Sequence, residues 1–325
     1  MRAGTDSEPR DLVSVVIPAR NEADKIASTV AAVLRQSTAT VALEVIVVDD
    51  GSTDRTAALA AEAGACVIRL DTADNGNPGI ARNRGAEATR GDPIVFLDAD
   101  CEVQDDWLRF LLEAHSEGAT IVGGSLELPR GLGFVARCDY YCGWYLIHPE
   151  AKAGKVPHHP PPNLSVRRKA FLSSSGFTEE PPIALTNEER NWQAELRRAG
   201  HYIYFEPRAV AAHANRPGLG QMLRRQYRWG YTAVESKSKT GSARLSWLYR
   251  SPALVVATGV PLALVQGGYI LGCWLKVGEW EPLLMMPLIF LSRIVYGAGM
   301  TVGGFRWLRS GKAPDGRGDR TRVRW

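Results

Sequence analysis

The sequence predicts an α/β fold, with a mostly parallel central sheet flanked by helices and two membrane helices near the C-terminal end. The first observation behind this prediction is an alternation, between residues 12 and 127, of short runs rich in Val and Ile with amphipathic segments. Buried parallel strands and the helices that cover them give this pattern. The second observation is a pair of long apolar stretches that follows the α/β region.

The strands and helices of the α/β region are placed by their apolar runs. We expect strands at 13–17, 45–49, 66–70 and 94–97. The helices between them are expected to begin near Asp24, Thr53 and Gly79. Right-handed crossovers stack such strands in one twisted sheet. Residues 1–11, which precede the first strand, are expected to be disordered.

From residue 131 to residue 162 the alternation weakens, and the segment ends in three prolines that cannot continue a helix. A loop or lid is expected there. Beyond it, helices are expected at 187–199 and 220–236, with short strands at 202–205 and 209–212. These elements complete one domain over residues 12–240.

The apolar stretches, at 252–275 and 282–305, are each close to the ~20 residues that cross a bilayer. Residues 250–306 are therefore expected to form two transmembrane or membrane-associated helices. The alternative is a pair of buried or interfacial helices. Arg293 favours this alternative for the second stretch, because an Arg at the centre of a span costs roughly 2.5–3.5 kcal/mol.

Charge is distributed unevenly along the chain of 325 residues. The formal net charge is only +4, and basic residues concentrate in a tail at 307–325, so the charge does not indicate nucleic acid as a partner. Lys and Arg flank the two apolar stretches, whereas the turn between them holds Lys276 beside Glu279 and Glu281. The positive-inside rule then predicts an inner-membrane protein whose α/β domain is cytoplasmic.

Five cysteines are present, an odd number without a CxxC pair, and the N-terminus lacks the apolar core of a signal peptide. Both observations indicate a reduced, cytosolic environment. Cys138 and Cys142 stand one helical turn apart, but no second Cys/His pair has suitable spacing for a zinc site. Packing is the favoured interpretation of this pair.

Two carboxylates, Asp98 and Asp100, follow the buried run at 94–97. Ligands of α/β sheets bind at such strand ends. Two oxygen ligands at this spacing suit Mg²⁺ or Mn²⁺, which would retain open positions for the oxygens of a diphosphate. The alternative is a helix cap, since Asp-x-Asp is common by chance.

Polar clusters follow two other strands. Asp49 and Asp50 end the second strand, where Asp50 could accept a hydrogen bond from a nucleotide base, although Asp-Gly-Ser-Thr-Asp is also a good turn and helix N-cap. Residues 18–22, Pro-Ala-Arg-Asn-Glu, follow the first strand. Three clusters at one sheet edge predict a binding site more strongly than any one of them.

In order along the chain stand VSVVIPARNE, VIVVDDGSTD, GIARNRGAEATRGDPIVFLDAD and NLSVRRKAF, followed by an acidic pair and a late histidine. With these motifs, residues 13–230 resemble the family 2 glycosyltransferases, which have the Rossmann-like GT-A fold. The resemblance implies that Pro18, Glu22 and Asp50 cradle the base and ribose. It also implies that a metal on Asp98 and Asp100 bridges the donor diphosphate, with His213 completing the site. A lone histidine after a strand is otherwise more often structural. The donor-binding residues expected on this basis are Pro18, Arg20, Glu22, Asp50, Arg82, Asp98, Arg225 and Arg228.

The catalytic base of this family is usually the Asp of a Glu-Asp pair that opens a helix, and the matching residues here are Glu188 and Glu189. Glu189, one methylene longer than Asp, is expected to remove the acceptor proton. The alternative is that both side chains only favour a helix N-terminus through its dipole.

The run Arg225-Gln226-Tyr227-Arg228-Trp229 resembles the Q/RxxRW motif of processive members. In them the Trp stacks on the acceptor sugar and the Arg residues meet donor phosphates. An Arg- and Trp-rich helix before a membrane segment is equally typical of an interfacial anchor, and both interpretations stay open.

The resemblance implies an inverting glycosyltransferase, of the hexosyltransferase type. It would move a sugar from a nucleotide-sugar donor to a hydroxyl or phosphate of a lipid-linked or saccharide acceptor, with Mg²⁺ or Mn²⁺ as cofactor. The alternative is a catalytically impaired nucleotide-sugar-binding membrane protein, because Glu189 replaces the usual Asp. A sugar nucleotidyltransferase or a dehydrogenase is not favoured, since no Gly-rich phosphate loop follows the first strand.

Overall fold

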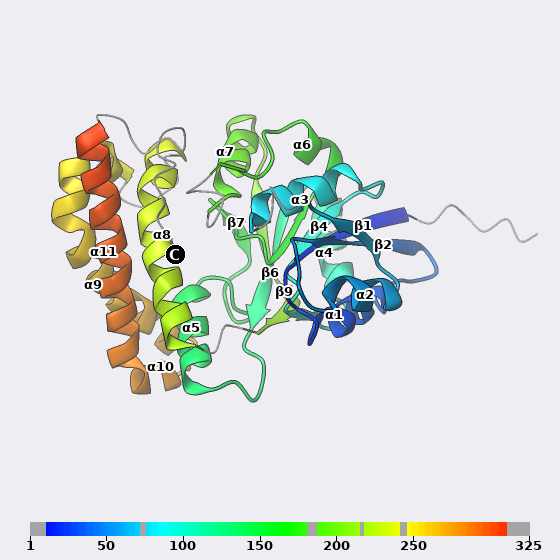
Figure 1. Cartoon of the computed structure of the whole chain (residues 1–325), viewed down its shortest axis with the longest axis horizontal. Coiled ribbons are helices and arrows are strands. Elements are labelled where there is room, and N and C mark those ends of the chain that lie inside the picture. Colours follow the sequence, from blue (N-terminus) through cyan, green and yellow to red (C-terminus); the bar gives the residue numbers. More distant parts are fainter. Residues whose placement is uncertain (1–10, 72–75, 181–186, 215–217, 241–245, 311–325) are drawn as a thin grey trace, which may run out of the picture. The chain divides into compact units, whose positions relative to one another are not determined.

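A computed structural model of the chain describes residues 11–71, 76–180, 187–214, 218–240 and 246–310. These residues form two compact units, which we describe separately (Figure 1). The sheet unit comprises Met1–Glu127, Lys152–Gly176 and Glu195–His213. The helical unit comprises Leu128–Ala151, Phe177–Ala194 and Ala214–Trp325.

The sheet unit is built on one sheet of nine strands in the order β3-β2-β1-β4-β8-β6-β9-β5, with β7 paired to β9. The strands are β1 (Asp11–Ala19), β2 (Val41–Asp49), β3 (Cys66–Arg69), β4 (Ile94–Leu97), β5 (Cys101–Val103), β6 (Ile121–Glu127), β7 (Gly154–Val156), β8 (Asn163–Val166) and β9 (Ile203–His213). The four strands expected in the first region are confirmed and all run parallel. β8 runs antiparallel to both β4 and β6, and β5 and β7 run antiparallel to β9.

The two short strands expected at 202–205 and 209–212 are one continuous strand, β9. Its pairing with β6 shifts register between Gly124 and Ser125, so that Glu206 and Val210 stand opposite neighbouring residues. The residues between them include Pro207, which has no backbone N–H to give to a ladder. A bulge therefore lies where the sequence predicted a break between two strands.

Helices accompany the strands of the sheet. They are α1 (Ile26–Leu34), α2 (Thr56–Glu62), α3 (Pro78–Glu87), α4 (Trp107–Ser116), α6 (Arg168–Leu172) and α7 (Arg190–Arg198), the last of which continues from the helical unit into the sheet unit. α1, α2 and α3 begin close to the expected positions, α7 lies within the helix expected at 187–199, and α4 and α6 were not expected. α3 begins where Asn77 accepts hydrogen bonds from the N–H groups of Gly79 and Ile80 at 3.0 and 3.2 Å. Gly85 lets α3 approach the sheet, because a Cβ there would lie 2.3 Å from a methyl carbon of Val16.

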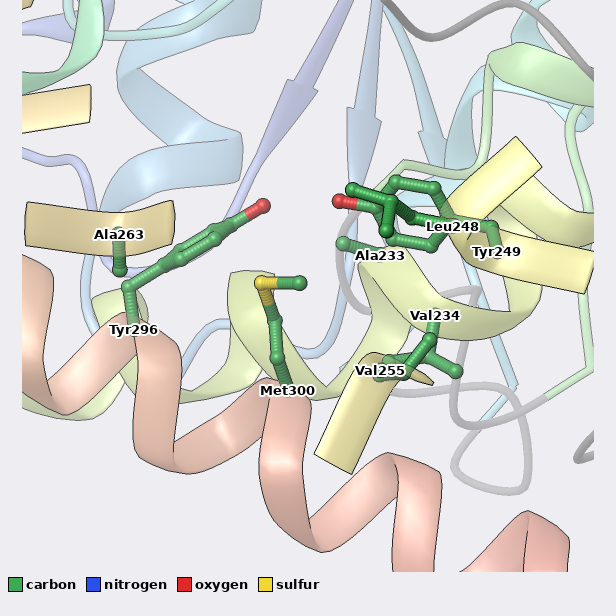
Figure 2. Close-up of a cluster of buried hydrophobic side chains, with 8 residues drawn as sticks. All are labelled: Ala233, Val234, Leu248, Tyr249, Val255, Ala263, Tyr296 and Met300. Carbon is green, nitrogen blue, oxygen red and sulfur yellow. The ribbon is translucent and has the colours of Figure 1, made fainter. Parts of the chain in front are cut away.

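The helical unit consists of α5 (Phe134–Gly143), α8 (Leu219–Thr240), a 3₁₀ turn η2 (Ser246–Arg250), α9 (Pro252–Lys276), α10 (Glu281–Leu284) and α11 (Met286–Ser310). Figure 2 shows one of its buried clusters, in which Ala233 and Val234 of α8 meet side chains of η2, α9 and α11. α9 and residues Met286–Arg309 of α11 are long and apolar enough to cross a membrane, by length and composition. They therefore fit the hairpin expected at 250–306.

A further expectation was wrong: α5 and β7 lie inside the segment from 131 to 162 that was interpreted as a loop or lid. The aromatic and thiol side chains of α5 recur at helical spacing, and Cys138, Tyr141 and Cys142 are buried. The prolines at 160–162 had suggested an irregular segment, but they lie well beyond the helix. At the ends of the chain, β1 already begins at Asp11 and α11 continues to Ser310; the expected disordered residues 1–10 and basic residues 311–325 lie outside the described residues.

Candidate active site

The carboxyl ends of β1, β2 and β4 meet at one edge of the sheet. β1 and β2 pair in register up to Ala19 and Asp49, and β1 pairs with β4 up to Val16 and Phe96. The N–H of Asp50 donates to the carbonyl of Ala19 at 2.8 Å, which holds the first two strand ends together. The polar residues that follow these strands therefore emerge from the same edge.

The loops after β1 and β2 are tied to each other by several hydrogen bonds. The N–H of Asn21 donates to Ser52 Oγ at 2.9 Å, and Asn21 Oδ1 accepts from the N–H of Thr53 at 2.8 Å. The N–H of Glu22 donates to Thr56 Oγ1 at 2.8 Å, and Glu22 itself is half-buried. These hydrogen bonds fix the backbone of the segment that contains Pro18, Arg20 and Glu22.

Two of the three acidic residues at and after the end of β2 form a turn, and the third does not. Asp49 Oδ1 accepts from the N–H of Ser52 and Asp54 Oδ1 from the N–H of Thr56, each at 3.0 Å, so these two carboxylates form the turn and helix start that the sequence allowed as an alternative. Asp50 takes no part in that turn. Its Oδ1 accepts from the N–H of Gly76 at 2.7 Å instead, and the side chain is 6% exposed.

Electrostatics at Asp50 follow from its burial. Desolvation raises the pKa of Asp50, and the negative charge of Asp49 adds to this, while the N–H of Gly76 and the Arg20 guanidinium act in the opposite direction. Arg20 lies over Gly76, because a Cβ on that glycine would be 2.7 Å from Arg20 Nη1. A glycine with φ of 83° at this point thus leaves room for the Arg20 side chain.

Asp98 and Asp100 stand between β4 and β5 and converge with His213. His213 Nε2 lies 3.5 Å from Asp100 Oδ1 and 4.0 Å from Asp98 Oδ2. The convergence follows from strand pairing, because β5 runs antiparallel to β9 with Cys101 opposite His213. A residue more than a hundred positions away is thereby brought to the end of β4.

Two contacts position the Asp98 to Asp100 segment. Arg82 of α3, which is 4% exposed, donates through Nη2 to Asp98 Oδ1 at 2.8 Å. Thr29 of α1, also buried, donates to the carbonyl of Ala99 at 2.9 Å. Sequence reasoning missed Thr29, whose only signal was a hydroxyl on the apolar face of an amphipathic helix. The sequence predicted Arg82 as a donor-binding residue, which stays a prediction; in the structure Arg82 contacts Asp98, another residue of that predicted set.

The ligating side chains around His213 suit one divalent ion. Two ligand atoms each ~2.1 Å from an ion lie about 3 Å apart at a right angle and about 4.2 Å apart when opposite, and the observed separations fall within this range. Cys101 belongs to the same group of ligating side chains. However, burial and the charges of Asp100 and Asp98 raise the pKa of its thiol, and Sγ lies 3.7 Å from the carbonyl of Pro162. Asp100 and His213 therefore remain from that group, and Asp98, whose Oδ2 lies 4.0 Å from His213 Nε2, stands beside them. Carboxylate oxygens are the ligands that Mg²⁺ and Mn²⁺ prefer.

The acidic pair expected to hold the catalytic base lies in the helical unit, directly before α7. Glu188 and Glu189 are 5% and 3% exposed. The carbonyl of Glu188 accepts from the N–H of Thr178 at 2.9 Å, and Arg190 Nε lies 4.0 Å from Glu189 Oε1. Asn187, with φ of 77°, makes the bend before the pair. The two carboxyl groups thus occupy a buried position rather than the exposed first turn of a surface helix.

The Arg- and Trp-containing motif lies on α8, also in the helical unit. Arg225 forms an ion pair with the fully buried Asp139 of α5, and its guanidinium lies 4.7 Å from the centre of the Trp229 ring. Trp229 in turn meets Trp144 edge to face, with ring centres 6.2 Å apart. Arg228, like Trp229, is half-buried. These side chains are packed within the unit, which a simple surface anchor would not require.

Comparison with known proteins bears on the sheet unit most directly. The model of the family described as "Glycosyl transferase family 2" matches residues 14–172. Among curated proteins, glycosyltransferase AglE of Haloferax volcanii is 29% identical over 229 residues, which cover 69% of this chain and 73% of AglE. The succinoglycan biosynthesis protein ExoO of Rhizobium meliloti is 34% identical over 197 residues, covering 59% of this chain and 53% of ExoO. The chain thus spans about half the length of ExoO.

Two solved structures share the fold. The mannosyltransferase PcManGT from Pyrobaculum calidifontis, solved with GDP-Man and Mn²⁺, aligns with a TM-score of 0.58 at 17% identity, over 92% of this chain and 88% of PcManGT. TarS of S. aureus, residues 1–349, aligns with a TM-score of 0.51 at 17% identity, over 92% of each chain. Residues 14–172 therefore match the family 2 glycosyltransferases, and the chain has the GT-A fold; its curated relatives indicate that it is a glycosyltransferase.

Proposed function

We propose that this family 2 glycosyltransferase moves a sugar from a nucleotide-sugar donor to a hydroxyl or phosphate of a lipid-linked or saccharide acceptor, with inversion at the anomeric carbon. The observation that carries the proposal is the convergence of Asp98, Asp100 and His213 at the end of β4. Such a cluster at the carboxyl edge of an α/β sheet is where a nucleotide diphosphate binds.

The donor would be held by residues of the sheet unit. Asp50, whose Oδ1 accepts from the N–H of Gly76, would also accept an N–H of the base, while Pro18 and Glu22 would contact the base and ribose. Arg20, exposed and adjacent to Asp50, would meet the donor's phosphates. Arg82 would act through Asp98, whose orientation it fixes by a charge-assisted hydrogen bond.

The metal would be Mg²⁺ or Mn²⁺, held by Asp98, Asp100 and His213. When bound, a divalent cation neutralises charge that builds on the leaving diphosphate. These ligating side chains support Mn²⁺ at least as well as Mg²⁺, because the imidazole of His213 binds Mn²⁺ better than it binds Mg²⁺. PcManGT, which shares the fold, was solved with Mn²⁺.

We assign the role of base to Glu189, with Glu188 beside it. An acceptor hydroxyl would lose its proton to Glu189 as its oxygen bonds to the anomeric carbon, while the bond from that carbon to the diphosphate oxygen breaks. The burial of Glu189 and its place directly before α7 support the assignment. Trp229, with Arg225 and Arg228, is proposed for the acceptor side, with the Arg residues also reaching donor phosphates.

The membrane role rests on the two apolar helices. We propose that the protein resides at the inner membrane with its catalytic domain in the cytoplasm, where nucleotide sugars are made, and that no nucleic acid takes part. A lipid-linked acceptor would be delivered at the surface to which α9 and α11 anchor the enzyme. The succinoglycan protein ExoO, a curated relative, supports a saccharide as the other acceptor class.

The test is a screen of purified full chain in detergent against UDP-, GDP- and TDP-sugars, with and without Mn²⁺, for nucleotide binding and for release of the nucleoside diphosphate. Asp100→Asn should abolish metal-dependent binding and release. Asp106→Asn is the matched control, because Asp106 is exposed and its φ of 63° suits Asn.

The outcomes separate the two functions that the sequence left open. Metal-dependent release supports the transferase. Metal-dependent binding without transfer to any polyprenyl-phosphate, oligosaccharide or simple glycoside acceptor would favour a nucleotide-sugar-binding membrane protein without catalysis. No metal-dependent binding of any donor would refute the proposal.

A further inference from the structure

The helical unit exposes a broad apolar surface along α9, α10 and α11. Its exposed side chains include Leu264, Val265, Tyr269, Leu284, Ile294 and Phe305. A surface of this kind marks contact with lipid or protein. By length and composition it suits a hairpin that crosses the bilayer and equally a hairpin that enters one leaflet and returns. Packing inside the helical unit distinguishes the two.

First, α8 runs beside α11 and in the same direction (Figure 1). Gln226 accepts a hydrogen bond from Arg293, and further along both helices Tyr231 accepts one from Arg306. Between these pairs the backbones touch, since a Cβ on Gly230 would lie 1.9 Å from the carbonyl oxygen of Tyr296. From Arg293 to Arg306 the rise along α11 is about 20 Å. That is about two thirds of the ~30 Å hydrocarbon core.

α8 is too polar for that depth. If α11 crossed the bilayer, the neighbouring part of α8, with Arg228, Glu235 and Lys237, would lie level with the lipid chains. Figure 2 shows the hydroxyl groups of Tyr249 and Tyr296 turned toward each other, and Lys237 Nζ donates to them at 3.1 and 3.3 Å. A lysine is thus bound against the middle of α11, where a spanning helix would meet the centre of the membrane.

Second, α5 holds the turn of the hairpin from both sides. Trp274, near the end of α9, donates through Nε1 to the carbonyl of Tyr141 at 3.0 Å. Tyr141 Oη donates to Glu281 Oε2 at 2.7 Å, and Arg137 forms an ion pair with the same carboxylate. The turn between α9 and α11 must therefore lie on the same side of the membrane as α5.

The chain around α5 has no length for a crossing. It leaves β6 at Glu127 and enters β7 at Gly154. Two crossings, out and back, need ~40 residues. The segment between is shorter, and it contains Arg130, Arg137 and Asp139. α5 and the turn that it holds therefore stay on the side of the membrane where β6 and β7 lie, because the segments that join α5 to these strands are too short to cross.

We propose that the hairpin does not cross the bilayer: α9 and α11, with α5 and α8 packed on them, enter one leaflet as a monotopic anchor whose turn faces the same side as its ends. The partner is a leaflet that contains anionic phospholipid. Trp247 and Trp280 are exposed at the borders of the apolar surface, and Arg250 and Arg309 are exposed beside it, as an interfacial anchor requires. The proposal rests on the membrane association proposed above, but not on the chemistry.

The test uses a thiol at the turn. Glu279→Cys is made in the full chain, since Glu279 is exposed, and inside-out bacterial membrane vesicles are treated with a membrane-impermeant maleimide before and after detergent. The native exposed Cys66 of β3 is the internal control for the cytoplasmic side. Lys276→Cys, also exposed, provides a second position in case the first variant fails to fold.

We expect the introduced thiol and Cys66 to be modified to the same extent without detergent, and we expect the protein to stay in the membrane pellet in high salt. Modification of the introduced thiol only after detergent, or from outside in intact cells, would show a spanning hairpin and overturn the proposal. Release by salt alone would overturn it as well, by excluding apolar insertion. None of these measurements depends on turnover, so a failure here is distinguishable from a failure of the proposed transfer reaction.

Discussion

The two groups of candidate residues are held in different ways. In the sheet unit, Asp98, Asp100 and His213 converge because β5 pairs with β9, and that register is a property of backbone hydrogen bonds. In the helical unit, Glu189 and Trp229 are positioned by side chains packed among α5, α7 and α8. Geometry set by a ladder survives most side-chain changes, whereas geometry set by packing depends on each volume. The geometry of Asp98, Asp100 and His213, which we call the metal group, should therefore tolerate more substitutions than that of Glu189 and Trp229.

The largest effect is expected at Glu189. Glu189→Gln keeps the shape but cannot accept a proton, so kcat should fall by roughly 10²- to 10⁴-fold. The donor's dissociation constant should stay the same, because the metal group belongs to the sheet unit. Glu180→Gln, an exposed carboxylate before the same helix, is the control. Steady-state kinetics with a separate binding titration give both quantities, and an equal loss in the two would mean that Glu189 is structural.

The next effect concerns the fragility of the helical unit. Gly230→Val would place Cβ 1.9 Å from the carbonyl oxygen of Tyr296, so the unit should lose about 3 kcal/mol or more of stability. Gly268→Ala, where a Cβ meets nothing within 4 Å, should cost nothing and could add up to about 1 kcal/mol of helix stability.

Thermal unfolding in detergent measures both variants, and metal-dependent nucleotide binding is measured alongside, below the unfolding transition. If Gly230→Val also abolishes metal-dependent nucleotide binding, the metal group depends on packing in the helical unit, and the two groups of residues do not differ as expected.

A smaller effect is expected where the sheet unit does depend on a side chain. Arg82→Gln removes the cation that orients Asp98 at 2.8 Å, so the affinity for metal and nucleotide should fall 10- to 100-fold. Arg84→Gln removes an exposed ion pair with Glu87 and should leave the affinity unchanged. Isothermal titration with Mn²⁺ and nucleotide checks this pair. Equal affinities for both variants would show that backbone pairing alone positions Asp98.

The smallest effect is a pH dependence from Asp50. Because burial raises the pKa of Asp50, the carboxylate that is proposed to accept from the base gains its proton at a higher pH than an ordinary Asp, whose pKa is about 3.9. Nucleotide affinity should then weaken as the pH falls toward that range, by less than tenfold per pH unit. Asp50→Asn should bind more weakly and lose this dependence. A wild-type affinity that does not change with pH down to about 4.5 would contradict the assignment.

Much of the sheet unit could be predicted from residue patterns alone. The runs that became β1, the second half of β2, and β4 are continuous apolar segments that are mostly buried, as parallel strands covered by helices are. β3, at the edge of the sheet, is more exposed and was indicated by its Val and Ile residues. The order of motifs then indicated Asp50, Asp98, Asp100 and His213 as candidates. α5 was missed because its aromatic residues and the prolines at 160–162 were interpreted together as one irregular segment, although the helix ends at Gly143, well before the prolines.

What the sequence determined by itself was therefore local: strand ends, the acidic pairs that follow them, and two helices apolar enough for a membrane. Tertiary structure decided what depends on contacts between distant segments. Pairing of β5 with β9 brought His213 to Asp100, the fold of α3 onto the sheet brought Arg82 to Asp98, and α5 and α8 determined how the C-terminal hairpin is packed. The spacing of apolar residues predicts which face of a helix is apolar. Whether protein or lipid covers that face depends on the tertiary packing.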